Sequence, residues 1–135
     1  MSKISRDELK KRGFKRFLMS WKNSFDGFSY AYKNEQSMLI HAVCTFFTIL
    51  FGILFQIKFT EWAIMFIALG FILGMELINT AIEAVVDLVT LEIHPLAKIA
   101  KDCGSAATLT ATLVAVAISL FVFGPYFLEL FGIIL

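Results

Sequence analysis

The chain has 135 residues, of which 59% are hydrophobic and only 17% are charged, with a net charge of +1. A domain this small exposes a large share of its surface, and a mean hydropathy of +0.79 is too high for that surface to face water. The composition therefore excludes a soluble enzyme, a disordered tail and a secreted disulfide scaffold, and indicates a single membrane domain over residues 1–135.

The charges are distributed unevenly. Residues 1–36 carry nine Lys and Arg against four Asp and Glu, a net charge of +5, whereas residues 37–89 carry one Lys against four acids, a net charge of −3. The basic residues alternate with Phe and Trp, which suits lipid headgroups better than a phosphate groove. We therefore expect this arm to meet a membrane surface, and we expect no nucleic acid partner.

The first predicted element is an amphipathic surface helix over residues 5–28. Its apolar residues recur every three or four positions, as Phe14, Phe17, Leu18, Trp21, Phe25 and Phe28. This pattern is typical of a helix lying in the membrane interface, and the alternative is a cytoplasmic helix packed on its own protein. We expect Asp26 and Gly27 to interrupt or end the helix.

Three transmembrane helices are predicted next. Residues 37–57 contain no Lys, Arg, Asp or Glu, and 21 helical residues extend about 31 Å, the thickness of a bilayer core. A four-residue connector forces an antiparallel return into a second span over 62–89. Residues 90–102, with Pro95, predict a cytoplasmic loop with a helical restart, and residues 103–128 form the third span.

Lys and Arg cluster before the first span and after the second, so we expect the N-terminus to be cytoplasmic and the C-terminus to lie outside. Three helices offer little room to enclose a polar site, which predicts a homo-oligomer.

The second span carries an unusual polar stripe. Glu76, Asn79, Glu83 and Asp87 are spaced i, i+3, i+7 and i+11, which places them within an arc of about 80° on a helix. Carboxylates at membrane depth cost a few kcal/mol each, on the order of 3, and three on one stripe repel one another. A cation is therefore expected to neutralise them.

The stripe alone leaves several functions open. Protons or Na⁺ would indicate a transporter subunit, Mg²⁺ with substrate phosphates would indicate phosphoryl transfer, and a third reading is a non-enzymatic membrane assembly subunit. Lys101 and Asp102 at the start of the third span favour phosphoryl transfer, because a lysine there suits phosphate oxygens. Glu35, just before the first span, offers another metal ligand. No P-loop and no protein-kinase motif set is present.

The string ELINTAIE at 76–83 with Asp87, followed by AKD at 100–102 and GSAA at 104–107, resembles the prokaryotic diacylglycerol kinase family. The resemblance extends from Arg16 through the third span. It implies an all-α integral membrane homotrimer with composite sites in the bacterial cell membrane. It also implies direct transfer of the γ-phosphate of Mg-ATP to a lipid alcohol, without a phosphoenzyme.

By the same resemblance, Glu76 is the base that deprotonates the lipid hydroxyl, and Asn79 orients Glu76 or that hydroxyl. Glu35 and Glu83 are the implied Mg²⁺ ligands. The implied nucleotide-binding residues are Arg16, Asn23, Glu35, Glu83, Asp87, Thr90, Leu91, Glu92, Lys101 and Asp102. The implied lipid-substrate residues are Arg16, Glu76 and Ser105.

His41 and the His94-Pro95 pair resemble the Gram-positive branch of the family, whose members act as undecaprenol kinases. The branch implies undecaprenol as the acceptor and undecaprenyl phosphate as the product. The alternative acceptor is diacylglycerol, the substrate of the Gram-negative enzyme, which would give phosphatidic acid.

Overall fold

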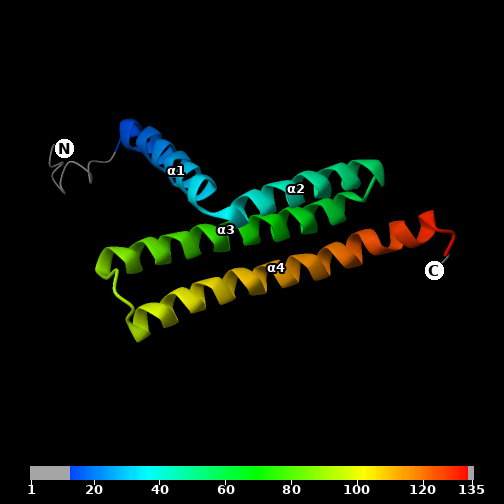
Figure 1. The fold of residues 1–135 in the computed structure, drawn as a ribbon. Helices are drawn as coiled ribbons and strands as arrows, with labels where there is room; N and C mark the ends of the chain where they lie inside the picture. The colour runs from blue at the N-terminus through cyan, green and yellow to red at the C-terminus, as the bar shows by residue number, and fades with distance from the viewer. Residues whose placement is uncertain (1–12, 134–135) are drawn as a thin grey trace.

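The computed structural model describes residues 13–133, and most of this part of the chain is helical (Figure 1). Its helices are α1 (Phe14–Asn34), α2 (Gln36–Leu54), α3 (Phe59–Val89) and α4 (Pro95–Leu130). The helices α2, α3 and α4 are each long and apolar enough to cross a membrane. The predicted all-helical, three-span fold class is confirmed.

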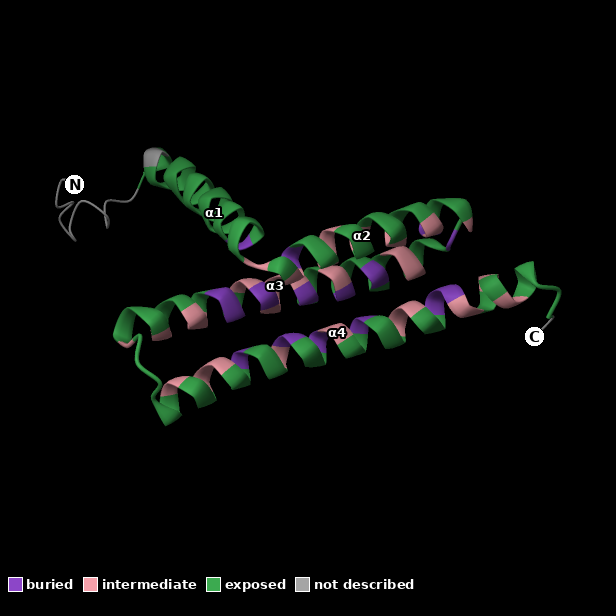
Figure 2. Ribbon diagram, in the orientation of Figure 1, coloured by how far each residue is buried: buried purple, intermediate pink, exposed green. Residues whose placement is uncertain are grey.

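The helix α3 is the centre of the arrangement. It packs antiparallel against α4 along most of its length. The first part of α3 also packs antiparallel against α2, and α1 lies at an angle to the other helices (Figure 1). The buried residues follow the facing sides of α3 and α4 (Figure 2). Small residues, Ala68 on α3 with Ala111 and Ala115 on α4, form one buried cluster there. Such residues let two membrane helices approach closely.

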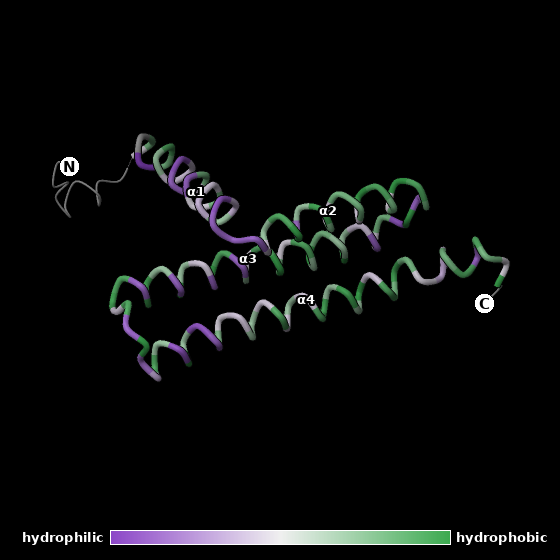
Figure 3. Tube along the Cα trace, viewed as in Figure 1, coloured by the Kyte–Doolittle hydropathy of each residue, from purple (hydrophilic) through white to green (hydrophobic). Residues whose placement is uncertain are grey.

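The apolar surface of the spans is mostly exposed in the single chain. Figure 3 shows hydrophobic residues around α2, much of α3 and most of α4, with hydrophilic residues gathered in α1 and around the α3–α4 loop. Exposed apolar side chains include Phe46, Ile67 and Phe121. Apolar faces of this extent are typical of surfaces that meet lipid or another protein.

The surface helix differs from its predicted limits. Residues 5–12 of the predicted range lie outside the described residues, and α1 continues through Gly27 to Asn34 instead of ending at residue 28. The final turn is retained because it packs on the bundle: Ala31 is fully buried, and Tyr30 and Ala31 share a cavity with Leu77 and Thr80 of α3. Tertiary contact there outweighs the weak helix propensity of a glycine.

The helical restart predicted within residues 90–102 comes early in that range. The helix α4 begins at Pro95, so only residues 90–94 connect it to α3. Pro95 stands at the first helical position, where its missing N–H costs no hydrogen bond. His94 caps the helix by accepting a hydrogen bond at Nδ1 from the Leu96 N–H, 3.2 Å away.

The turn between α2 and α3 is tight. The Ile57 N–H bonds the Gly52 carbonyl at 3.1 Å, the Gln56 N–H bonds the Ile53 carbonyl at 3.2 Å, and Gln56 has a φ of 51°. This is a Schellman motif in which a non-glycine residue takes the left-handed position. Gly52 is required for the close return, since a Cβ there would lie 2.6 Å from the Trp62 ring.

The unequal lengths of α2 and α3 set the position of the polar stripe. Gly52 of α2 faces Trp62 near one end of their contact, and Ser37 of α2 reaches Glu76 near the other. The thirteen residues of α3 that follow Glu76 therefore project past α2 by about 20 Å. The stripe begins beside the start of α2 and continues along the part of α3 that projects past it.

Candidate active site

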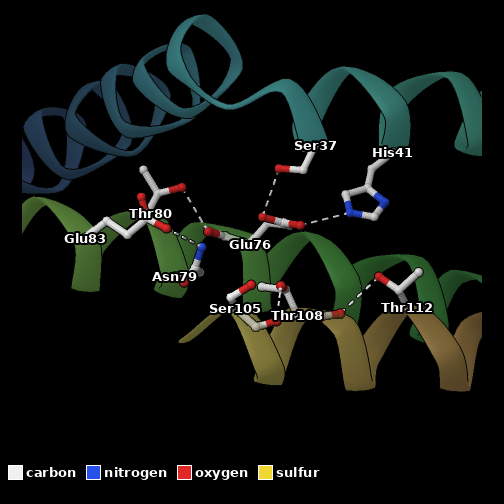
Figure 4. Close-up of polar contacts among 9 residues, drawn as sticks. All are labelled: Ser37, His41, Glu76, Asn79, Thr80, Glu83, Ser105, Thr108 and Thr112. Atoms are coloured by element: carbon white, nitrogen blue, oxygen red, sulfur yellow. Dashed lines mark hydrogen bonds and ion pairs between the residues drawn. The ribbon is translucent and has the colours of Figure 1, made fainter. Parts of the chain in front are cut away.

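The carboxylate of Glu76 is held between α2 and α3. Glu76 is 5% exposed. Its Oε2 accepts a hydrogen bond from Ser37 Oγ at 3.1 Å, and its Oε1 lies 3.0 Å from His41 Nε2 (Figure 4). Ser37 and His41 are four residues apart on α2, so both point to the same side of that helix. Each carboxylate oxygen therefore has one partner, supplied by α2.

Asn79 lies one turn further along α3 and contacts a different carboxylate. Its Nδ2 donates to Glu83 Oε1 at 3.1 Å, whereas its Oδ1 is buried with no hydrogen-bond partner among the described residues. Its amide group therefore holds Glu83, and the role that the resemblance implied for Asn79, to orient Glu76 or the lipid hydroxyl, stays a prediction. The free Oδ1 is an acceptor that suits a hydroxyl group.

The helix α4 closes over this amide at Gly104. A Cβ at that position would lie 2.3 Å from Asn79 Oδ1, so only glycine allows the two helices to come this close without a shift. Sequence reasoning noted Gly104 only as part of a motif. The close approach is a property of the packed pair of helices and has no local sequence signal.

Glu35, between α1 and α2, faces the same carboxylates. Its partial burial, and then the negative charges of Glu83 and Glu76, raise the pKa of Glu35 above its ordinary value. Among residues 13–133, no three His, Cys, Asp or Glu side chains converge into a metal site of their own. Mg²⁺ is usually held by one or two carboxylates plus water and substrate phosphates, so Glu35 and Glu83 fit a share of its ligand set.

A second polar region lies beyond Glu83, around the α3–α4 loop. Lys101 Nζ of α4 lies 2.6 Å from Asp87 Oδ1 of α3, and Lys98 pairs with Asp102 along α4. A cavity of about 330 Å³ opens here. Its lining includes six of the predicted nucleotide-binding residues, Asp87, Thr90, Leu91, Glu92, Lys101 and Asp102.

The remaining predicted residues lie elsewhere. Arg16 and Asn23 are on α1 and exposed, and neither lines the cavity around the loop. Ser105 is exposed on α4, with its carbonyl accepting a hydrogen bond from Thr108 Oγ1 at 2.8 Å (Figure 4). Within one chain, then, Glu76, Asn79 and Glu83 form one group and the residues around Lys101 form another.

Sequence reasoning missed Ser37 and gave His41 no function in the site. A usable signal existed: the two are the polar residues of one helical face at the start of an otherwise apolar span. A polar pair i, i+4 in a membrane helix requires a partner on a neighbouring helix.

Comparison with known proteins decides between the functions considered for this chain. The sequence matches the prokaryotic diacylglycerol kinase family over residues 22–123. The chain belongs to this family. It is an ATP-dependent lipid kinase with several membrane spans, not a transporter subunit or a passive assembly component.

Three relatives illustrate the range of the family. Undecaprenol kinase of Bacillus subtilis is 35% identical, over 92% of this chain and 97% of its own length. Diacylglycerol kinase of Helicobacter pylori strain J99 is 33% identical, over 90% of this chain and 92% of its own. Diacylglycerol kinase of Escherichia coli K12 is 32% identical, over 77% of this chain and 85% of its own.

Proposed function

We propose that this kinase transfers the γ-phosphate of Mg-ATP to undecaprenol and releases undecaprenyl phosphate and ADP. The observation that carries the chemistry is the buried Glu76 carboxylate, held by two side chains from the start of α2 and followed along α3 by a polar cavity. An alcohol confined to lipid and a nucleotide confined to water meet only at the boundary between the two.

Glu76 is the base in this proposal. The bond between the hydroxyl oxygen of the lipid and its hydrogen breaks as the proton passes to the Glu76 carboxylate, and the oxygen attacks the γ-phosphorus in line with the leaving ADP. A base must lie within hydrogen-bond reach of the proton it takes. Because Ser37 and His41 fix the carboxylate, its remaining lone pairs have a defined direction.

Mg²⁺ is proposed to be held by Glu35 and Glu83 together with the phosphates of ATP. When bound, it would neutralise charge on the β- and γ-phosphate oxygens. The support comes from this chain's residues: the raised pKa of Glu35 beside two other carboxylates, and the Asn79 amide that fixes Glu83. A cation there relieves the repulsion among the three acids.

The nucleotide is proposed to occupy the cavity around the α3–α4 loop. Lys101 would exchange its ion pair with Asp87 for phosphate oxygens, and residues 90–92 and Asp102 would surround the nucleoside. Asp87 is eleven residues from Glu76, about 16 Å along α3. An extended triphosphate is suited to that separation between the nucleoside and the base.

The surface helix is proposed to lie in the membrane interface and to admit the lipid. Its aromatic residues are exposed and in ring contact along one face, from Phe14 through Phe17 and Trp21 to Phe25. A mostly apolar cavity of about 410 Å³ separates α1 from α3, lined by Phe28 and Leu77 among others. An acceptor chain in this cavity would run beside Thr80, one turn from Glu76.

We propose a homotrimer with composite sites in the bacterial cell membrane, with the N-terminus cytoplasmic and the C-terminus outside. The exposed apolar faces of the spans supply surface for neighbouring protomers. Arg16 and Asn23 on α1 are exposed and do not line the cavity around the α3–α4 loop, and Ser105 on α4 is exposed beside Gly104. A neighbouring protomer would bring them to the nucleotide and the lipid, the roles proposed for them.

The acceptor is tested by the initial rate of labelled phosphate transfer from Mg-ATP, measured side by side with undecaprenol and diacylglycerol in mixed micelles. Similarity to an undecaprenol kinase over nearly its whole length favours undecaprenol. Faster transfer to diacylglycerol would instead assign the alternative function, shared in name with the Helicobacter and Escherichia relatives. Transfer to neither acceptor by folded protein would contradict the proposal.

A further inference from the structure

Both partners of the Glu76 carboxylate come from α2, but they differ in how firmly the helix holds them. Ser37 Oγ reaches Oε2 at 3.1 Å and His41 Nε2 lies 3.0 Å from Oε1. Ser37 stands at the second position of α2, next to the break at Glu35, whereas His41 lies a full turn inside the helix. The imidazole is also nearly buried, with its side chain 12% exposed. His41 is therefore the partner with the better fixed backbone.

A histidine at this depth is costly unless its polar atoms are satisfied. The neighbouring residues on α2, Leu39, Ile40 and Val43, are apolar and exposed, as expected for a face that meets lipid. His41 instead turns toward α3 and meets Glu76 through Nε2 (Figure 4). The contact pairs Nε2 with Oε1 and, together with Ser37 on Oε2, limits the rotation of the carboxylate.

We propose that His41 is the positioning residue of the base: through Nε2 it orients the Glu76 carboxylate so that a lone pair faces the lipid hydroxyl. This inference rests on the proposed role of Glu76. With Ser37 on the second oxygen, each carboxylate oxygen has one partner, and the directions of its remaining lone pairs are fixed. Other acids near Glu76 are Glu35 at the start of α2 and Glu83 on α3, and both add negative charge that favours a donor at His41.

Because His41 contacts Glu76 through Nε2, glutamine and asparagine at position 41 are expected to behave differently. Nε2 is the outer ring nitrogen of histidine, and the terminal amide nitrogen of glutamine reaches about as far from the backbone. The amide of asparagine stops near the position of Nδ1. His41→Gln is therefore expected to keep a donor at Oε1, and His41→Asn is expected to lose it.

The test measures kcat and KM for Mg-ATP and for the lipid acceptor in His41→Ala, His41→Gln and His41→Asn. A misplaced reacting group costs on the order of 10²-fold in rate, so kcat should fall about that far in the Ala and Asn variants. His41→Gln should keep most of the kcat of the unmodified protein. KM for Mg-ATP should change less than about twofold, because positioning of the base acts in the transition state. Ile40→Ala, equally deep on α2 but exposed, is the matched control and should keep its rate.

Two results would overturn the inference. One is equal activity of the Gln and Asn variants, and the other is a joint change in kcat, KM and melting temperature, as expected of a packing residue. If His41→Ala does not fold, the Gln and Asn pair still decides. Glu76→Gln is assayed beside them: an inactive Glu76→Gln with a fully active His41→Ala overturns this inference alone, whereas an active Glu76→Gln overturns the proposed base as well.

Discussion

Asn79 of α3 lies against Gly104 of α4 so closely that a Cβ at position 104 would stand 2.3 Å from Asn79 Oδ1. The same amide holds Glu83 through its Nδ2, 3.1 Å from Oε1. The packing of α3 on α4 and the placement of the acidic side chains are therefore linked through one residue. A change at Gly104 acts on both.

Gly104→Ala is expected to displace Asn79 and to lower activity, because the new methyl group must push the amide or the helix away. Overpacking of this kind costs about 1–3 kcal/mol in stability. Gly124→Ala is the control in the same helix, since a Cβ there meets nothing within 4 Å. Melting temperature and transfer rate should fall together in Gly104→Ala, whereas Gly124→Ala should keep its rate and show an equal or higher melting temperature, because alanine favours a helix more than glycine does. A fully active Gly104→Ala would show that Asn79 needs no fixed position.

Removal of divalent cations is expected to abolish transfer, and Glu83→Gln should raise the Mg²⁺ concentration needed for half-maximal rate by tenfold or more. One oxygen ligand is lost in that variant, and the amide formed by the substitution is a weaker ligand for a hard cation. Glu61→Gln is the matched control, because Glu61 bonds Tyr126 at the other end of the bundle at 2.7 Å. An unchanged Mg²⁺ requirement in Glu83→Gln would remove this residue from the proposed ligands.

Lys101→Met is expected to lower kcat/KM for ATP by about 10²-fold, the usual loss when a preorganised positive group is removed from a developing charge. Asp87→Asn breaks the same half-exposed ion pair but leaves the Lys101 ammonium in place. The loss of kcat/KM for ATP should therefore stay below about tenfold. ATP saturation curves at fixed acceptor measure both. A greater loss in Asp87→Asn than in Lys101→Met would assign the main role to the carboxylate.

Gln56→Gly is expected to stabilise the protein without changing its rate. Gln56 holds a φ of 51° in the α2–α3 turn, where a side chain is unfavourable by about 1 kcal/mol and glycine is not. Thermal unfolding in micelles should show a higher midpoint. A lower midpoint would mean that the glutamine side chain contributes more than its backbone conformation costs.

Much of the fold was predictable because lipid imposes strong rules. Charge-free stretches of about 20 residues, and the spacing of Glu76, Asn79 and Glu83, follow directly from the period and rise of a helix. The start of α4 at Pro95 and the continuation of α1 past Gly27 were not predicted, since packing and capping overrode the breaking tendency of those residues.

The site was predictable in part for the same reason. Periodicity places the acids of α3 on one side of one helix. The partners of Glu76, Ser37 and His41, come from α2, and their contact depends on the angle and register of two packed helices. No pattern within either segment encodes that register. The contact between Asn79 and Gly104 is of the same kind.

The most direct test of the central claim is labelled phosphate transfer from Mg-ATP to undecaprenol by the unmodified protein and by Glu76→Gln, with Glu61→Gln as the control carboxylate. If Glu76 is the base, Glu76→Gln should fold normally and lose about 10²–10⁴-fold in kcat, the range expected for loss of a general base. Glu61→Gln should keep its rate. A folded Glu76→Gln that transfers phosphate at the unmodified rate would contradict the account.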